Sequence, residues 1–300
     1  MPHNCFRCAP DISPSSSACL PCGVSFPLVR IASPVLGPWA VAAARCVLAS
    51  LVLGLLMVAL RQRWPARRQW PALAWLGLGS VVLPFVLFNW AALALPASYS
   101  AVLNATVPLF GILGAALVRE ERLTVRRLLG CAAGFVGVAL LVRLGPVAVT
   151  PAVIWAALAC IAASASYGLS ASYMKRASAR HEPLAAAAAV HVAASVILLI
   201  PAGVAAPAMQ ISTGALLAVA MLGFVTSGFM YWVSLRLMRE IPASAATSAA
   251  FMIPLFGVTW GALFLGEPVT ASMLPGGLLI LLAMILVTGF NPFQAAPPEP

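Results

Sequence analysis

Two arginines stand inside apolar stretches near the start of this sequence, where a fixed positive charge has few partners. Arg30 and Arg45 flank a turn at residues 34–38 and lie about 6 and 10 Å deep by helical rise. None of the seven Asp and Glu residues falls within a predicted span. Because an unpaired cation in lipid costs at least ~2.5 kcal/mol, such residues normally face a wet cavity or an anionic ligand. We expect one or both to attract a carboxylate or phosphate; the alternative is that they extend to the nearby head groups.

One histidine and two glutamates are candidates for proton coupling. His191, about 10 Å from one end of its apolar stretch, is the only histidine in a predicted span and can accept a proton near neutral pH. A hydrogen-bonded packing role is the alternative. Glu121 and Glu267 each follow an apolar stretch, at a helix C-terminus where the dipole disfavours a carboxylate. Pairing with a basic neighbour, gating and plain solvation therefore remain open for both.

Polar and aromatic side chains in or near the apolar stretches suit the wall of a cavity. Trp and Tyr are also ordinary anchors at membrane interfaces, so a structural role competes with this interpretation. With Arg30 and Arg45, the candidate substrate-binding residues are Asn89, Trp90, Asn104, Pro108, Tyr167, Tyr231, Trp232 and Pro254.

The cysteines do not form a disulfide pattern, because they number seven and Cys46, Cys131 and Cys160 lie inside apolar stretches. Cys5-x2-Cys8 and Cys19-x2-Cys22 together have the four thiols that tetrahedral zinc requires. The spacer of ten residues and the position of Cys22 in an apolar stretch weigh against zinc. We therefore expect no metal and no cofactor.

The elements that must position these residues are membrane helices. With 62% hydrophobic and 8% charged residues, the chain lacks the charged surface of a soluble protein. Its apolar runs are long enough to cross a bilayer, and they are apolar all round, unlike the alternating strands of a β-barrel. Nine spans are predicted, at residues 39–60, 72–95, 98–118, 128–144, 152–173, 184–200, 214–235, 243–265 and 272–290, with a weaker first span at 18–35.

Basic residues alternate between the loops and predict the orientation. Counting the weak first span, thirteen Arg and Lys residues fall in one set of loops, whereas the opposite set holds only Arg143. The positive-inside rule then places both termini in the cytoplasm and the protein in the inner (plasma) membrane. The net charge of +10 is explained by this topology, so we expect no nucleic-acid partner.

An internal repeat divides the chain into two halves. Residues 96–124 align without gaps on residues 242–270, at an offset of 146, and share Pro-Ala-Ser, Pro-Leu-Phe-Gly, a Glu and a following Thr. Such a match between apolar helices indicates duplication. The predicted domains are a polar N-terminus at 1–19, five-helix repeats at 20–145 and 151–290, and a tail at 291–300.

An odd number of helices per repeat inverts the second half in the membrane. The predicted fold is therefore an all-α membrane protein of about ten transmembrane helices, arranged as two inverted five-helix repeats. In this arrangement Pro108 and Pro254 both lie about 15 Å deep, near the midplane. Each proline lacks an N–H and leaves a carbonyl without its helical partner, which a substrate, water or side chain can satisfy. A simple packing kink is the alternative.

The chain resembles the EamA type of the drug/metabolite transporter superfamily. The marks are GVSFPLVR at Gly23–Arg30, Gly37-Pro38 with Ala-Ala-Ala-Arg45, and a Pro-Leu-Phe-Gly helix followed by Glu and Thr in each half. The resemblance implies a proton-coupled or gradient-driven carrier of amino-acid-like or drug-like metabolites, often an exporter, working as a monomer or homodimer in the bilayer. The family's first helix usually carries Trp-Gly, whereas Cys22 precedes Gly23 here, which leaves the completeness of this helix open.

Two other functions compete with transport. A membrane-embedded enzyme needs clustered His, Asp, Glu or Cys within the spans, and the predicted spans offer one histidine, no carboxylate and separated cysteines. We therefore predict that the protein is not an enzyme. A non-transporting or degenerate membrane subunit stays open because of the unusual N-terminus.

Overall fold

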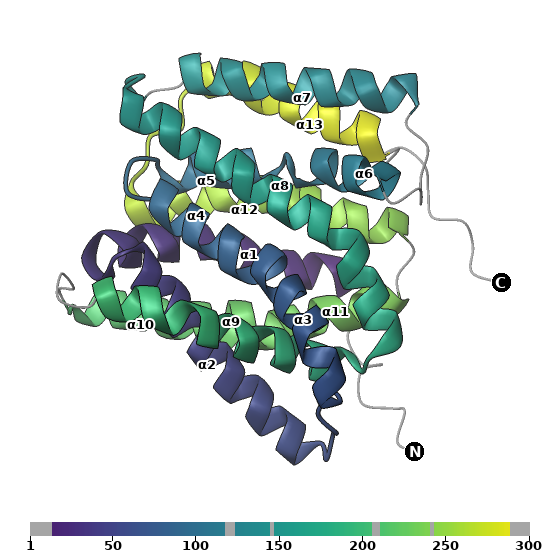
Figure 1. Cartoon of the computed structure of the whole chain (residues 1–300). Helices are drawn as coiled ribbons and strands as arrows, with labels where there is room; N and C mark the ends of the chain where they lie inside the picture. Colours follow the sequence, from purple (N-terminus) through teal and green to yellow (C-terminus); the bar gives the residue numbers. More distant parts are fainter. Residues whose placement is uncertain (1–13, 118–123, 145–146, 206–210, 241–242, 289–300) are drawn as a thin grey trace.

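The computed structural model describes residues 14–117, 124–144, 147–205, 211–240 and 243–288. Every regular element in these ranges is a helix. The Ala- and Leu-rich sequence explains this, because a helix satisfies its backbone hydrogen bonds internally in a medium that offers none. Figure 1 shows the helices packed as a bundle with their axes roughly along one direction.

The helices of the first half are α1 (Pro14–Leu36), α2 (Pro38–Ala59), α3 (Trp70–Gly77), α4 (Leu83–Ala91), α5 (Ala97–Asn104), α6 (Val107–Leu117) and α7 (Val125–Leu144). The second half contributes α8 (Pro151–Arg180), α9 (Pro183–Ala205), α10 (Thr213–Met221), α11 (Met230–Glu240), α12 (Ala243–Leu265) and α13 (Leu274–Thr288). Two π-helical segments, η2 (Leu78–Val82) and η4 (Leu222–Phe229), join α3 to α4 and α10 to α11. Short 3-10 turns precede α3 and α13.

Six stretches of the described chain are long and apolar enough to cross a membrane, at Pro38–Ala59, Arg67–Ala91, Ala97–Leu117, Pro151–Ala177, Pro183–Ala205 and Thr213–Val233. The apolar helices Gly23–Leu36, Ile253–Leu265 and Ala271–Val287 are shorter. The chain is therefore a multi-pass helical membrane protein.

The two ends of the bundle differ in charge. The α2–α3 connection, the start of α7 and the ends of α8 and α11 all lie toward the right-hand side in Figure 1. Exposed basic residues occupy these segments, and this end is called the arginine end: Arg61, Arg63, Arg67, Arg68, Arg126, Lys175, Arg176, Arg180 and Arg236. The opposite end holds the α1–α2, α4–α5 and α12–α13 connections and is called the Glu267 end.

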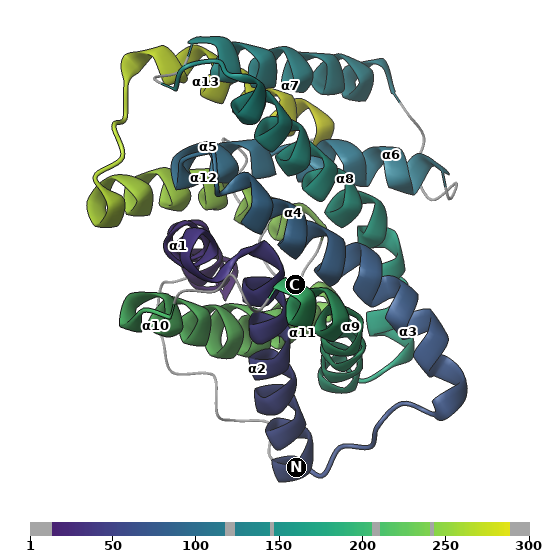
Figure 2. The same cartoon turned by 60° about the vertical axis from the view of Figure 1, so that its left-hand side comes forward.

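Helices from the two sequence halves interleave instead of forming separate bundles. The main contacts pair α1 with α12 and α10, α2 with α9 and η4, α8 with α4 and α6, and α7 with α13. Both views show α7 and α13 side by side in an outer layer (Figures 1 and 2). Gly130, Gly134 and Gly137 allow this close approach, since a Cβ on Gly137 would come within 3.0 Å of the Gly276 carbonyl oxygen.

Helix α5 and helix α12, which belong to the two repeat segments, run in opposite directions. Glu267, two residues after the end of α12, accepts hydrogen bonds from the first residues of α5. Further along the same seam, a Cβ on Gly257 of α12 would come within 2.2 Å of the Ala101 side chain. The α12 C-terminus therefore lies beside the α5 N-terminus, as Figure 2 also shows.

Candidate functional site

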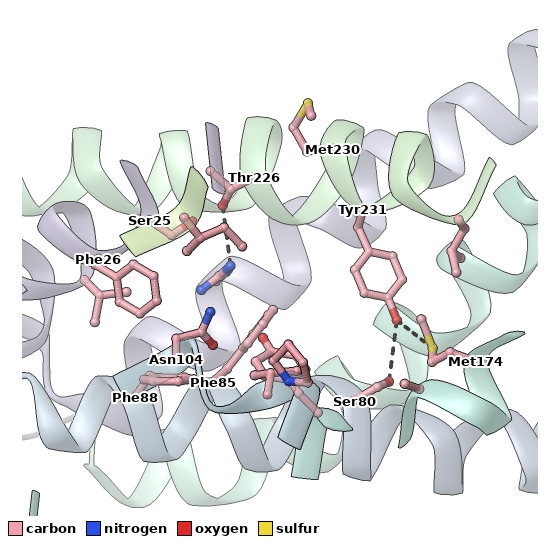
Figure 3. A pocket seen from close by; sticks show the side chains of 18 residues that line it. Ser25, Phe26, Ser80, Phe85, Phe88, Asn104, Met174, Thr226, Met230 and Tyr231 are labelled. Atoms are coloured by element: carbon pink, nitrogen blue, oxygen red, sulfur yellow. Dashed lines mark hydrogen bonds between the residues drawn. The ribbon is translucent and has the colours of Figure 1, made fainter. Parts of the chain in front are cut away.

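A cavity of about 390 Å³ lies inside the bundle and is lined by 18 side chains. The lining comes from both sequence halves, through α1, α2, η2, α4, the α5–α6 break, α8, η4, α11 and α12. Most of it is apolar or aromatic, and Figure 3 shows Phe26, Phe85 and Phe88 at one side of the cavity and Tyr231 with Met174 at the other. Such a mixture of apolar wall and few polar groups is typical of small-molecule sites.

Arg45 provides the only full charge among the described lining residues. It stands on α2 and is 8% exposed. Its Nε donates to Ser227 Oγ, and Nη2 lies 3.5 Å from Thr226 Oγ1. The guanidinium carbon is 3.7 Å from the centroid of the Phe85 ring, a cation–π contact. These contacts fix the guanidinium at the cavity wall, where its charge can attract an anion.

The other polar corner of the cavity is built around Tyr231. Its hydroxyl donates to Met174 Sδ at 3.3 Å and lies 3.5 Å from Ser80 Oγ. Ser80 donates its own proton to the Leu76 carbonyl at 2.6 Å, so with both hydroxyl protons already donated, Ser80 and Tyr231 are polar neighbours in this arrangement. Figure 3 shows both contacts of Tyr231 pointing across the cavity from η4–α11 to the opposite helices.

The two π-helical segments position these hydroxyls. Ser80 lies in η2 and Thr226 in η4, and each donates to the carbonyl four residues back, at 2.6 Å for Ser80 and 2.8 Å for Thr226. Side chains that bond back to the helix backbone compensate carbonyls that a widened turn releases. Both helices thus bulge beside the cavity, and each presents a hydroxyl there.

The helical path is interrupted between α5 and α6, beside the cavity. Ala105 and Thr106 form a tighter turn with i→i−3 hydrogen bonds in place of α-helical ones, and the lining residues Asn104, Val107 and Pro108 flank this break. Pro108 has no N–H for the Asn104 carbonyl, so its position at the break agrees with the predicted loss of a helical bond. Its repeat counterpart behaves differently, since Pro254 is buried within the continuous helix α12 and only its neighbour Ile253 lines the cavity.

The structure thus gathers five of the predicted binding residues in one cavity: Arg45, Asn104, Pro108, Tyr167 and Tyr231. The others lie elsewhere. Arg30 donates from Nη1 to the Ala92 carbonyl, at the corner after α4. Asn89 is fully buried and donates to the Pro38 carbonyl at 3.0 Å, which ties α4 to the start of α2. Trp90 is 44% exposed, and Trp232 packs on Phe229.

The three predicted proton-coupling residues do not lie together. His191 is fully buried behind the lining, with its ring edge-on to Tyr231 at 4.6 Å between centroids. Its Nδ1 lies 3.0 Å from the Ala187 carbonyl, and Nε2 has no hydrogen-bond partner among the described residues. Glu267 is outside the cavity, and Glu121 lies outside the described residues.

The three cysteines whose side chains the structure describes are not part of the cavity lining. Cys46, Cys131 and Cys160 are buried free thiols in α2, α7 and α8. Cys5 and Cys8, and the side chains of Cys19 and Cys22, lie outside the described part of the chain, so the expectation of no metal there stays untested.

Sequence reasoning missed several lining residues, namely Phe26, Ser80, Phe85, Phe88, Thr226 and Met230. Inside an apolar run a cavity Phe looks like any core or lipid-facing Phe, and a lone Ser or Thr is common in membrane helices. One signal was present: the repeat offset of 146, extended beyond the aligned segment, pairs Ser80 with Thr226 and Phe85 with Tyr231.

A cavity of mixed apolar and cationic character within a multi-pass helical membrane protein is what a carrier of small molecules requires. Comparison with known proteins makes this specific. The EamA-like transporter family matches the chain twice, over residues 16–143 and 154–289, and the chain belongs to this family. It is a transporter-family protein and not an enzyme.

Relatives agree with this assignment. The chain is 26% identical over 273 residues to a probable terminal-alkyne amino-acid exporter of Streptantibioticus cattleyicolor, covering 88% of each protein. It is 27% identical over 277 residues to the uncharacterized transporter YvbV of Bacillus subtilis, covering 91% of this chain and 90% of that one. A solved crystal structure aligns over 91% of this chain and 95% of its own, with a TM-score of 0.65 and 16% identity, which supports the fold alone.

Proposed function

We propose that the protein carries small amino-acid-like anions or zwitterions across the membrane, that the cavity is their binding site, and that it opens to the two faces in turn. The observation that carries this proposal is the fixed guanidinium of Arg45 in a cavity formed by both sequence halves. A buried charge held by hydroxyls and a ring, and facing a cavity, is positioned for an anionic ligand.

Alternating access requires two halves that rock against each other, and we infer ten helices in two inverted repeats. Three observations support this arrangement. The family matches the chain twice, α5 and α12 run antiparallel, and η2 and η4 overlap when shifted by 146 residues. The same shift relates residues around the cavity: Arg45 with His191, Phe85 with Tyr231, and Ser80 with Thr226.

These paired residues make related contacts in the two halves. Arg45 stacks on Phe85 of its own half and reaches Thr226 of the other half. His191 packs on Tyr231 of its own half, and Tyr231 in turn approaches Ser80 of the other half. A pseudo-twofold axis through the cavity, as in inverted-repeat carriers, accounts for both sets of contacts.

The cavity chemistry limits the substrate. One guanidinium favours a single carboxylate, because a carboxylate accepts two hydrogen bonds from its planar donors. The surrounding Phe26, Phe88 and Met230 side chains suit an apolar or aromatic tail. One water molecule takes roughly 30 Å³ of liquid volume, so the cavity has room for on the order of a dozen waters or for a small ligand of the same volume. A relative named as a probable amino-acid exporter has the same class of ligand.

The direction we propose is export, driven by protons. The arginine end faces the cytoplasm under the positive-inside rule, which places the protein in the inner membrane with both termini inside. His191 is the proposed proton acceptor, since Nε2 lacks a described partner and the imidazole contacts a ring that lines the cavity. Protonation of the His191 imidazole would place a positive charge behind Tyr231, in addition to the charge of Arg45 at the cavity wall.

Flux measurements in proteoliposomes test the proposal. Purified protein, with a pH gradient across the vesicle membrane, should move apolar or aromatic amino acids in a saturable manner. Ala171→Trp should abolish the flux by filling the cavity, whereas Leu158→Trp, on an exposed face of the same helix α8, should not. Flux equal to that of empty vesicles over an amino-acid and drug panel would instead support a non-transporting subunit.

A further inference from the structure

Glu267 connects the two halves at the end of the bundle that carries few basic residues. Its Oε1 accepts a hydrogen bond from the Ala97 N–H at 2.6 Å, and Oε2 accepts one from the Ser98 N–H at 2.9 Å. These are the first two N–H groups of α5. Glu267 itself follows α12, 170 residues later in the chain. One carboxylate therefore bridges the end of a second-half helix and the start of a first-half helix.

The start of α5 depends on this carboxylate for its cap. The N-cap residue is Pro96, which supplies no side-chain hydrogen bond. Free N–H groups and the helix dipole at an N-terminus favour an anion, so the contact satisfies two donors at once. The carboxylate sits at the C-terminus of its own helix, where the dipole disfavours it, and only the neighbouring helix compensates this position.

A tight turn aims Glu267 at α5. Gly266 has a φ of +62°, in the left-handed region that glycine tolerates. The Glu267 N–H donates to the Gly261 carbonyl at 3.2 Å, and the Gly266 N–H donates to the Ala262 carbonyl at 3.1 Å. With Gly266 in the left-handed region, its bond to Ala262 is the 5→1 bond of an αL C-cap, which fixes the direction of the following residue. The direction of the Glu267 side chain is thus set by the α12 terminus.

Below the carboxylate, α12 and α5 touch through small residues. A Cβ on Gly261 would come within 2.7 Å of Glu267 Oε2 and 3.5 Å of the Ser98 nitrogen. A Cβ on Gly257 would come within 2.2 Å of the Ala101 side chain. A core cluster that includes Phe88, Leu95 and Tyr99 continues from this seam, and Phe26 meets Phe88 edge-on at the cavity wall. The seam therefore continues into buried packing that reaches the cavity wall at Phe88.

We propose that Glu267 is a latch that holds the cavity shut at this end, and that its two hydrogen bonds to α5 break when the cavity opens there. The proposal rests on the transport cycle proposed above, because a carrier must part the two halves at each end in turn. The small residues of this seam let α12 and α5 pack closely, so opening at this end must break their van der Waals contacts together with the two hydrogen bonds. The bonds then act as a switchable contact between the halves.

Distances across the seam test the latch directly. Spin labels at Leu93→Cys, four residues before α5, and at Phe264→Cys, near the end of α12, are both at exposed positions. Pulsed electron–electron double resonance then reports the distance between the two halves, in a background with the seven native cysteines replaced. Glu267→Ala should raise the population of the longer distance by roughly tenfold or more, the factor that one charge-assisted hydrogen bond supplies. Ser272→Ala, an exposed change in the next turn, should leave the distribution unchanged.

A second variant distinguishes loss of the latch from a failure of Glu267→Ala to fold. Ala97→Pro removes the donor to Oε1 and leaves Glu267 intact, and proline is well tolerated at the first position of a helix. Both variants should shift the distances in the same direction. Unchanged distances with a lower melting temperature would overturn the latch and make Glu267 a permanent cap. The distance measurement needs no transported substrate, so the two proposals can fail separately. Flux by the wild type with unchanged distances in both variants refutes the latch alone. Absence of flux by the wild type refutes the transport proposal.

Discussion

Replacement of Arg45 should weaken substrate binding far more than replacement of Arg30. Both arginines stand in helices near the same turn, but only Arg45 lines the cavity, while Arg30 binds the Ala92 carbonyl at a corner. The change to examine is Arg45→Met, which keeps a long side chain and removes the charge. Arg30→Met is the matched control, with the same substitution at a position outside the lining.

The expected size of the effect follows from one charged hydrogen-bond partner. A hydrogen bond to a charged group contributes about 1.5 to 3 kcal/mol, which corresponds to roughly 10- to 100-fold in affinity. Arg45→Lys should fall between wild type and Met, because an ammonium retains the charge but not the planar donor pair or the stacking on Phe85. Arg30→Met should change the affinity by less than about threefold, within the range of an indirect effect.

The assay is the half-saturating concentration of a transported amino acid in proteoliposomes, with melting temperatures measured in detergent. The melting temperatures separate a lost ligand contact from a lost fold. Equal losses of affinity in Arg45→Met and Arg30→Met, at equal stability, would refute the assignment of the anion to Arg45. Full affinity in Arg45→Met would refute it as well.

Two further predictions concern the coupling residue and the packing. His191→Gln should abolish accumulation driven by a pH gradient and leave substrate counterflow intact, because it removes the imidazole that packs on Tyr231. His181→Gln, just after α8, is the control and should retain accumulation. Retained accumulation in His191→Gln would exclude His191 as the coupling residue. Gly168→Ala should lower the free energy of unfolding by about 1 to 3 kcal/mol, because its Cβ would lie 2.6 Å from the Gly111 nitrogen and the Val107 oxygen, both backbone atoms. Gly54→Ala has nothing within 4 Å and should leave the melting temperature unchanged or slightly higher; equal melting temperatures for the two variants would contradict this packing.

The sequence predicts the membrane class and the family well, because both depend on composition and on motifs spread over the whole chain. Apolar length alone marks a membrane helix, and the match to the EamA-like family extends over both halves. The positions at which helices are interrupted are harder to predict from the sequence. Pro108 marks a break between α5 and α6, yet the equivalent Pro254 lies within continuous α12. A proline removes one hydrogen bond, and the surrounding packing decides whether the helix stops there.

The candidate site is predicted only in part for a related reason. Arg45, Asn104 and Tyr231 can be singled out because polar groups in an apolar run need partners. The same argument selects Arg30 and Asn89, whose partners turn out to be the Ala92 and Pro38 carbonyls at helix corners. Which polar group faces a cavity and which satisfies a backbone carbonyl depends on how the helices rotate against each other. No single helix contains this information.

Sidedness of access to the cavity tests the central claim most directly. Asn104→Cys, in a background without the native cysteines, places one thiol beside the break that lines the cavity. A membrane-impermeant maleimide applied to either face of oriented vesicles should label this thiol from both faces, and a transported amino acid should slow the labelling. Labelling from one face only, under every combination of substrate and pH gradient, would contradict a cavity that opens to each side in turn.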